Sequence, residues 1–176
     1  MVVLDETGAH VAMTPAYARA PRNARAYERA PFNRGTNLTT LATLTTAGIT
    51  AAMTVVGAAD TLTVEAFVRE CVVPTLRPGQ LLVLDNVRTH KGDELRRLVE
   101  AAGCQVRFLP AYSPDLSPIE EAFSKVKTLL RRAEARTVET LEAAIGPALD
   151  AITPQDPRHY FAHCGYGIAK QPWKTL

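Results

Sequence analysis

The sequence contains no long hydrophobic run and few cysteines, and both absences limit the kind of protein it encodes. No apolar segment reaches the roughly 18 residues needed to span a bilayer. The first residues lack the charged, apolar and cleavable regions of a signal peptide. Three scattered cysteines (Cys71, Cys104 and Cys164) are never spaced C-x-x-C, which argues against a disulfide framework or a zinc ribbon. We therefore expect a cytoplasmic protein with reduced thiols and no membrane partner.

Motifs that mark several common enzyme classes are also missing. There is no glycine-rich phosphate loop, no dinucleotide-binding fingerprint and no serine-nucleophile elbow. A formal net charge of +2 neither requires nor excludes a nucleic-acid partner. The 176 residues suit one domain, and the 47% hydrophobic and 22% charged residues are typical of a globular protein. The function must therefore be sought in local patterns.

The first third of the chain predicts antiparallel strands. Residues 2–7 (VVLDET) form a short apolar run, after which we expect a turn at Gly8 and a return strand over His10–Met13. Asn37–Thr46 and Ile49–Val56 are rich in Thr, Val and Ile and flank a two-residue loop that contains glycine. Two such runs around such a loop predict a β-hairpin.

The rest of the chain alternates strand and helix patterns. Apolar runs predict strands over Gln80–Asp85, which is expected to be buried on both faces, and over Gln105–Leu109. Apolar residues at helical spacing predict helices over Thr63–Leu76, Asp93–Ala102, Ile119–Arg132, Val138–Ile152 and Pro157–His163. This order predicts one α/β domain over residues 1–176, with a mixed central sheet (an antiparallel meander plus parallel strands) flanked by helices.

A long arginine-rich connection separates the early strands. Residues 14–37 are punctuated by Pro, Gly and Asn, which predicts irregular structure, and contain one acidic residue, Glu28. Their basic residues are Arg19, Arg22, Arg25, Arg29 and Arg34. Loops of this length are uncommon in compact domains, and arginine suits phosphate contacts. We predict an arm that contacts nucleic-acid phosphates; a solvated loop is the alternative.

Two aspartates stand next to apolar strand patterns. Asp5 follows the first run, and Asp85 ends the most hydrophobic strand of the chain. A carboxylate there is costly to bury unless it is paired or bound to metal, and ligands of α/β sheets usually bind at strand ends. Either aspartate alone can be a turn residue that caps its own backbone. The pair favours a site.

A third carboxylate, Glu120, begins a helix. Ser117, followed by Pro118 and by Glu120 three residues after the serine, fits a helix-capping box, which needs no catalytic role. The same helix can instead direct Glu120, or its competitor Glu121, towards the two aspartates. Three carboxylates in one place would suit a two-metal site, because hard oxygen ligands hold the two Mg²⁺ or Mn²⁺ ions of phosphodiester chemistry.

Other polar residues are candidates for supporting roles. Asn86 can orient Asp85 by hydrogen bonding, and His90 can contact phosphate or the nucleophile, although both can be polar capping residues. Candidate DNA contacts are Lys91 and, within a basic stretch after Glu120, Lys125, Lys127, Arg131, Arg132 and Arg136, although a solvated helix face explains that stretch equally well. His159, His163 and Cys164 raise the question of a zinc site; without a fourth ligand, packing or capping is favoured.

Three segments together resemble a known protein family. Residues 4–8 (LDETG), 83–91 (VLDNVRTHK) and 108–127 (FLPAYSPDLSPIEEAFSKVK) are similar to the DDE catalytic domain of insertion-sequence transposases of the mariner superfamily. The 34 residues between Asp85 and Glu120, residues 86–119, match the spacing of its DDE form. The similarity extends to the tail segment 161–167 (FAHCGYG). Ser117 stands where this family more often has Asn, and either residue can cap a helix.

The resemblance implies an RNase H-like fold and Mg²⁺-dependent cutting of transposon ends, with joining of the 3′-hydroxyls to target DNA, typically at TA. It places Asp5, Asp85 and Glu120 in the catalytic triad, holding two metal ions, and favours Glu120 over Glu121. It also implies a nucleoid-associated homodimer in which the arginine-rich arm reaches the partner subunit. The alternatives are another RNase H-like metal-dependent nuclease, and an inactive remnant that acts only in DNA binding or assembly.

Relatives of this family carry helix-turn-helix modules ahead of the first catalytic aspartate, and here Met1 to Leu4 precede Asp5. We therefore expect the helix-turn-helix region to be absent from this chain. A separately encoded helix-turn-helix polypeptide becomes an expected partner. By itself, the chain is expected to cut DNA without selecting transposon ends.

Overall fold

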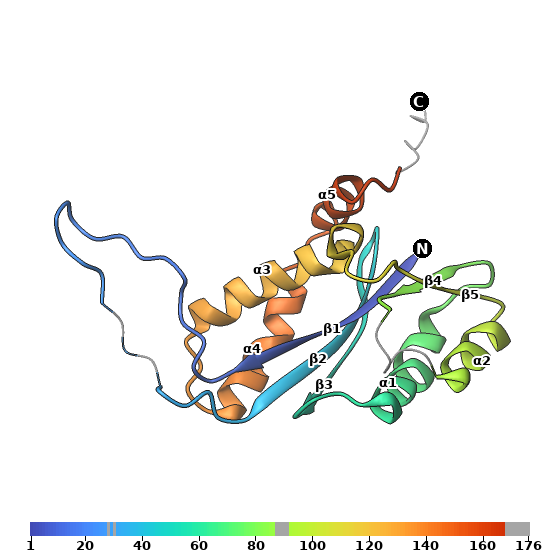
Figure 1. The fold of residues 1–176 in the computed structure, drawn as a ribbon, viewed down its shortest axis with the longest axis horizontal. Helices are drawn as coiled ribbons and strands as arrows, with labels where there is room; N and C mark the ends of the chain where they lie inside the picture. Colours follow the sequence, from blue (N-terminus) through green and yellow to red (C-terminus); the bar gives the residue numbers. More distant parts are fainter. Residues whose placement is uncertain (28, 30, 87–91, 168–176) are drawn as a thin grey trace, which may run out of the picture.

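The computed structural model describes residues 1–27, 29, 31–86 and 92–167 of the chain. Its sheet has the strand order β3-β2-β1-β4-β5 (Figure 1). The strands are β1 (Val2–His10), β2 (Asn37–Thr45), β3 (Gly48–Val56), β4 (Leu81–Leu84) and β5 (Gln105–Phe108). β1, β2 and β3 are antiparallel neighbours, whereas β4 runs parallel to both β1 and β5. The predicted mixed sheet, including its β2–β3 hairpin, is confirmed.

The first strand is longer than the sequence predicts. β1 continues through Gly8 and pairs with β2 as far as His10 opposite Asn37, so the predicted turn at Gly8 is wrong. A Cβ atom at Gly8 would lie 3.1 Å from the Asn37 side-chain oxygen, so glycine here permits close packing across the strands. The predicted return strand is also wrong: the Met13 N–H donates to the His10 carbonyl at 3.1 Å, and the chain turns away from the sheet.

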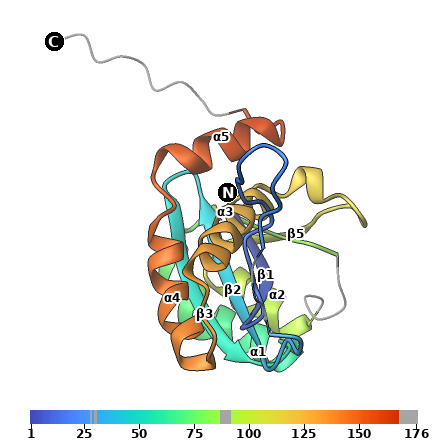
Figure 2. The ribbon, with the colours of Figure 1, turned by 90° about the vertical axis from the view of Figure 1, so that its left-hand side faces the viewer.

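Helices cover both faces of the sheet (Figure 2). One face carries α1 (Thr61–Phe67), which continues through a π turn and a 3-10 turn to Thr75, and α2 (Asp93–Ala101). The other face carries α3 (Pro118–Ala133) and α4 (Val138–Asp150), with α5 (Gln155–His163) packed against α3. Each predicted helix is therefore present. No helix within the described ranges is both long and apolar enough to cross a membrane.

Alternation along β1 divides the hydrophobic core between the two faces. Val3 packs with Phe123 and other residues of α3 and α4, whereas Leu4 packs with Phe67 of α1 and Val99 of α2. All five side chains are at most 1% exposed, and burying a side chain of this kind stabilises a fold by about 1.5–3 kcal/mol. Packing on both faces holds β1 at the centre of the domain, and Asp5 lies on this strand.

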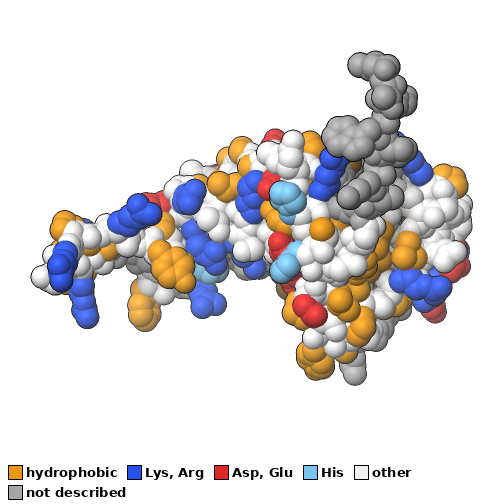
Figure 3. Space-filling view, turned by 90° about the horizontal axis from the view of Figure 1, so that it is seen from above, with side chains coloured by type: hydrophobic (Ala, Val, Ile, Leu, Met, Phe, Trp, Pro, Cys, Tyr) orange, Lys and Arg blue, Asp and Glu red, His pale blue; other side chains and the backbone are white. Residues whose placement is uncertain are grey.

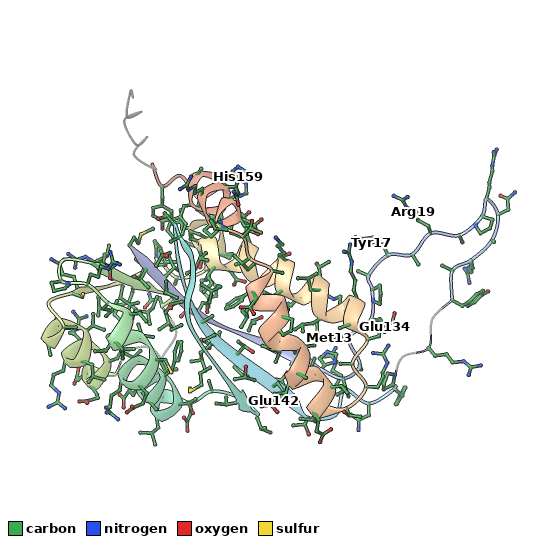
Figure 4. The ribbon with its side chains drawn as sticks, turned by 180° about the vertical axis from the view of Figure 1, so that it is seen from behind. Met13, Tyr17, Arg19, Glu134, Glu142 and His159 are labelled. Atoms are coloured by element: carbon green, nitrogen blue, oxygen red, sulfur yellow. The ribbon has the colours of Figure 1, made fainter. Side chains whose placement is uncertain are left out.

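Residues 14–36 form an arm that projects from the domain between β1 and β2 (Figure 1). At its root the Arg136 guanidinium donates to the carbonyls of Met13 at 3.0 Å and Val11 at 3.3 Å. Figure 4 shows Met13 near Glu134, just beyond the end of α3, and shows Tyr17 and Arg19 on the stretch of the arm that leads away from the body. The irregular connection predicted from proline, glycine and asparagine is therefore confirmed.

Candidate active site

Asp5 and Asp85 occupy matching positions on neighbouring strands. Parallel pairing sets Leu4 of β1 opposite Leu84 of β4, and each aspartate is the next residue along its chain. Neighbouring strands lie about 4.8 Å apart, so the two carboxylates are brought together where β4 ends. Asp85 stands at the end of its strand as predicted. The expectation that Asp5 follows its strand is wrong, because β1 continues for five residues to His10.

Asp5 is a buried carboxylate. The residue is only 8% exposed, and its Oδ1 accepts a hydrogen bond from the Glu6 N–H at 2.8 Å. Burial raises the pKa of Asp5 to about 7; the Glu6 hydrogen bond opposes this shift, and the negative charges of Asp85 and Glu120 add to it. These two carboxylates are therefore close enough to repel the charge of Asp5.

Glu120 lies in the first turn of α3 and is not used as a capping residue. The Ser117 side chain makes no capping hydrogen bond, and its N–H donates to the Pro114 carbonyl at 3.0 Å. A capping box needs that N–H as the donor to the glutamate. Because the serine is engaged elsewhere, the Glu120 carboxylate is left exposed at the sheet end.

The three carboxylates line one hollow of about 490 Å³. Asp5, Asp85 and Asn86 contribute from the sheet, and Glu120 contributes from α3. The rest of the lining is Glu6, Ser117 and the segment 109–114, which connects β5 to α3. The structure thus brings Asn86 to the same place as the carboxylates, whereas His90 and Lys91 lie outside the described residues.

Tyr112 is a lining residue that sequence reasoning did not single out. It is fully exposed on the wall of the hollow, and its φ of 59° places it in the left-handed region. A bulky residue in this conformation is strained, and such residues cluster at functional sites. The Tyr-Ser-Pro-Asp run of the signature was the available signal, because it marks a turn just before α3.

The donor set of this hollow suits magnesium. Carboxylate oxygens are the ligands that Mg²⁺ prefers, and one or two of them usually bind each ion together with waters and substrate phosphate. As the side chains stand, no three described His, Cys, Asp or Glu residues are grouped closely enough to hold one ion. Pairs of carboxylates are therefore the relevant unit. A divalent cation beside Asp5 would offset both the cost of burying its charge, which is the main cause of the raised pKa, and the repulsion from Asp85 and Glu120.

Glu121 faces a different environment. It lines a second, adjoining hollow with Cys164, and its Oε1 lies 2.5 Å from His163 Nδ1. Glu120 lines this adjoining hollow as well, and the contact with His163 links α3 to α5 through Glu121. A supporting role of Glu121 beside the three carboxylates stays a prediction. His159 is exposed on α5 (Figure 4), and within the described ranges His159, His163 and Cys164 form no metal-binding group.

The basic residues predicted to contact DNA fall into separate groups. Arg19, Arg22, Arg25 and Arg34 are all exposed on the arm. Lys125 is instead bound within the protein, because its Nζ donates to Asp156 Oδ2 at 2.7 Å. Lys127 lines a hollow at the other end of β1, together with Arg131. The local sequence does not distinguish Lys125 from Lys127, since the distinction depends on α5.

Comparisons with known proteins agree with this geometry. The family model described as DDE superfamily endonuclease matches residues 1–142. In fold the chain is similar to the Mos1 transposase paired-end complex with left transposon end (TM-score 0.70, 16% identity, 93% of this chain and 51% of that one). It is also similar to the catalytic domain of Mos1 mariner transposase (TM-score 0.60, 14% identity, 93% and 74%). No curated protein sequence matches the chain significantly.

A simian T-cell lymphotropic virus intasome in complex with the PP2A regulatory subunit B56 gamma shares the fold at a greater distance (TM-score 0.54, 13% identity, 82% of this chain and 46% of that one). The chain spans about half the length of the Mos1 transposase in its paired-end complex. The expected RNase H-like fold, in the form found in mariner transposase catalytic domains, is therefore confirmed. Because the family model covers most of the sequence, the chain belongs to the DDE superfamily of endonucleases.

Proposed function

We propose that this chain is a DNA transposase catalytic domain, which cuts transposon ends and joins the freed 3′-hydroxyls to target DNA at TA. The observation that carries the proposal is that Asp5, Asp85 and Glu120, from two strands and a helix, line one hollow. Membership of the DDE superfamily endonucleases supports the cutting step. The likeness in fold to the Mos1 strand transfer complex supports the joining step.

Asp5, Asp85 and Glu120 would hold Mg²⁺ or Mn²⁺ in this hollow. Two such ions, when bound, activate the attacking water or 3′-hydroxyl and stabilise the leaving oxygen. The charges of both Asp85 and Glu120 act on Asp5, which supports a shared role of the three carboxylates in holding metal. Asn86 lines the same hollow and has an amide that can donate to Asp85 or to a DNA phosphate.

Nicking of supercoiled plasmid DNA tests the catalytic assignment. Wild-type protein should nick the plasmid with Mg²⁺ or Mn²⁺ and not with EDTA. Asp85→Asn and Glu120→Gln should each reduce the rate at least about 100-fold, because each removes a charged ligand from the ions. Glu121→Gln is the matched control, since it removes the same charge one residue away, and should stay within a few-fold of wild type.

The products of the reaction separate this function from its alternatives. A transposase should also join a pre-cut 3′-hydroxyl DNA end to a target plasmid, whereas another nuclease of this fold should only cut. If wild type, Asp85→Asn and Glu120→Gln all gave only the same background amount of nicked DNA, the chain would have a non-catalytic role in DNA binding or assembly.

We further propose that the arm contacts a second copy of the chain. Its three large aromatic side chains (Tyr17, Tyr27 and Phe32) are 87% or more exposed. Aromatic residues and arginines are enriched in the buried centres of protein interfaces. The described part of the arm projects away from its own domain beyond the root (Figure 1) and presents both kinds of side chain, which suits a partner subunit better than solvent.

A further inference from the structure

A third hollow, of about 320 Å³, lies at the far end of β1 from the carboxylates. Gly8, His10, Ala12, Met13 and Thr14 form its floor, and Lys127 and Arg131 reach it from α3. We call it the basic hollow, because Lys127 and Arg131 bring positive charge to it and no acidic residue is among its lining residues. It lies at the root of the arm, where Figure 3 shows Lys and Arg side chains continuing from the arm onto the body.

The basic hollow and the carboxylate hollow share two structural elements. Each strand has two edges, and β2 pairs along one edge of β1 as far as His10. On the other edge β4 pairs only with Val2 to Leu4, so among the described residues no strand lies beside that edge from Asp5 to His10. α3 accompanies β1 on one face of the sheet. Glu120, Lys127 and Arg131 are spaced seven and four residues apart, which places them on one side of α3.

On both elements, about the same length separates the acidic residues from the residues that line the basic hollow. The five residues from Asp5 to His10 span about 17 Å of strand at 3.4 Å per residue. The eleven residues from Glu120 to Arg131 span about 16 Å of helix at 1.5 Å per residue. A DNA strand that follows this edge can present one backbone phosphate to each hollow, a few nucleotides apart, because its backbone advances farther per nucleotide than the rise of about 3.4 Å along the duplex axis.

The two positive charges of the basic hollow are not paired with acidic groups in the described part of the chain. Lys125 is paired with Asp156, and Arg136 donates to the carbonyls at the arm root. By contrast, no hydrogen bond or ion pair to the described part of the chain engages Lys127 or Arg131. Part of the positive charge at the end of α3 complements the helix dipole, but Lys127 lies too far from the last turn to serve that purpose.

His10 supplies a second, independent sign of a missing partner. Its ring nitrogen Nδ1 is buried and has no hydrogen-bond partner among the described residues. Buried polar atoms are rarely left without a hydrogen-bond partner in the protein, and such an atom calls for an explanation, such as a bound ion, a water or a functional role. Burial lowers the pKa of His10, and the charges of Arg34 and Arg131 lower it further, so positive charge is concentrated around this ring.

We propose that the basic hollow binds a backbone phosphate of the DNA strand whose reacting phosphate lies at the carboxylate hollow, a few nucleotides away. Lys127 and Arg131 would contact the phosphate oxygens, and His10 would line the contact. The inference rests on the proposed function for the identity of the strand. It adds a fixed second contact, which sets how far along the strand the carboxylates act.

The salt dependence of DNA binding tests the contact without any cleavage. In EDTA, the affinity for a 30-base-pair duplex of mixed sequence is measured by fluorescence anisotropy at several NaCl concentrations. Arg131→Gln and Lys127→Gln should each weaken binding several-fold and lower the slope of log affinity against log salt by up to about 0.9, the value for one phosphate. Together they should lower it by no more than about 0.9, because they share one phosphate.

Arg132→Gln is the matched control. Arg132 is exposed on the next position of α3, does not line the basic hollow, and loses the same charge. It should leave the slope and the affinity as in wild type. Equal effects of Arg131→Gln and Arg132→Gln would overturn the proposal, because general attraction to a basic surface would then explain the binding.

Neutral phosphates locate the contact along the strand. In a duplex whose Mn²⁺-dependent nick has been mapped, each phosphate near the nick is replaced in turn by methylphosphonate. One replacement, a few nucleotides from the nick, should weaken binding of wild type but not of Arg131→Gln. If no replacement distinguished the two proteins, the proposal would fail while cleavage stood. Lowered salt slopes for these variants, without any metal-dependent cleavage by wild type, would support the contact and contradict the proposed function.

Discussion

Lys125 Nζ donates to Asp156 Oδ2 at 2.7 Å, and this ion pair ties α3 to the start of α5. The same carboxylate oxygen accepts hydrogen bonds from the Thr153 N–H at 2.7 Å and the Thr153 hydroxyl at 2.8 Å. These partners lower the pKa of Asp156, with Lys125 contributing most. One lysine of the basic stretch is therefore a structural residue, whatever the chain binds.

This relationship predicts unequal losses of stability. Asp156→Ala should lower the free energy of unfolding by about 1–2 kcal/mol, because it removes both the ion pair and the bonds to Thr153. Lys125→Gln should cost no more than about 1 kcal/mol and leave the salt dependence of DNA binding unchanged. Urea unfolding measures the first quantity and anisotropy the second. A lower salt slope for Lys125→Gln would mean that this lysine contacts DNA.

Asp5 predicts a pH-dependent stability. Its pKa is raised from 3.8 to about 7 in the folded chain, so between these values the folded state holds a proton that the unfolded state has lost. Stability therefore falls as pH rises from about 4 to about 7, by at most about 4 kcal/mol.

Asp5→Asn removes this titration. In EDTA, the variant should gain stability relative to wild type as pH is raised from 5 to 8, measured by urea unfolding at each pH. Leu62→Ser, at an exposed position far along the sequence on α1, provides a variant whose difference from wild type should not change with pH. A constant difference between Asp5→Asn and wild type would show that Asp5 does not titrate in this range.

Divalent metal should stabilise the chain through the same carboxylates. At a Mg²⁺ concentration near ten times its Kd, we expect the Tm at pH 7.5 to rise by about 3–6 °C. Asp85→Asn and Glu120→Gln should reduce this rise, whereas Glu121→Gln should keep it because Glu121 pairs with His163. The measurement is differential scanning fluorimetry with Mg²⁺ and with EDTA. An equal rise in all four proteins would place the metal elsewhere.

The arm predicts a change of oligomeric state. Replacing Tyr17, Tyr27 and Phe32 by serine should convert a dimer of the 19.1 kDa chain into a monomer, measured by light scattering after gel filtration. The domain should stay folded, because these side chains are exposed and do not belong to its core. Leu62→Ser removes an exposed apolar side chain from the body and should leave the dimer intact. A monomeric wild type would refute the proposed partner role.

The sequence alone determined the elements and the identity of the candidate carboxylates. Apolar periodicity gave the helices and the hairpin, because a helix or strand must bury one face whatever it packs against. The resemblance to mariner-superfamily transposases, carried by the spacing from Asp85 to Glu120 and by the signature that ends at Glu120, favoured Glu120 over Glu121. Turn residues predicted the arm. These features are local, so they can be read without knowing which segments meet.

The tertiary structure decided everything that depends on segments distant in sequence. Gly8 reads as a turn in isolation, yet pairing with β2 carries the strand through it. Asp5 meets Asp85 because β1 pairs in parallel with β4. Lys125 and Lys127 look alike in the sequence, but α5 supplies a carboxylate to one while the free edge of β1 leaves the other facing a hollow. Strand register and helix packing are non-local, and they set where each charge lies.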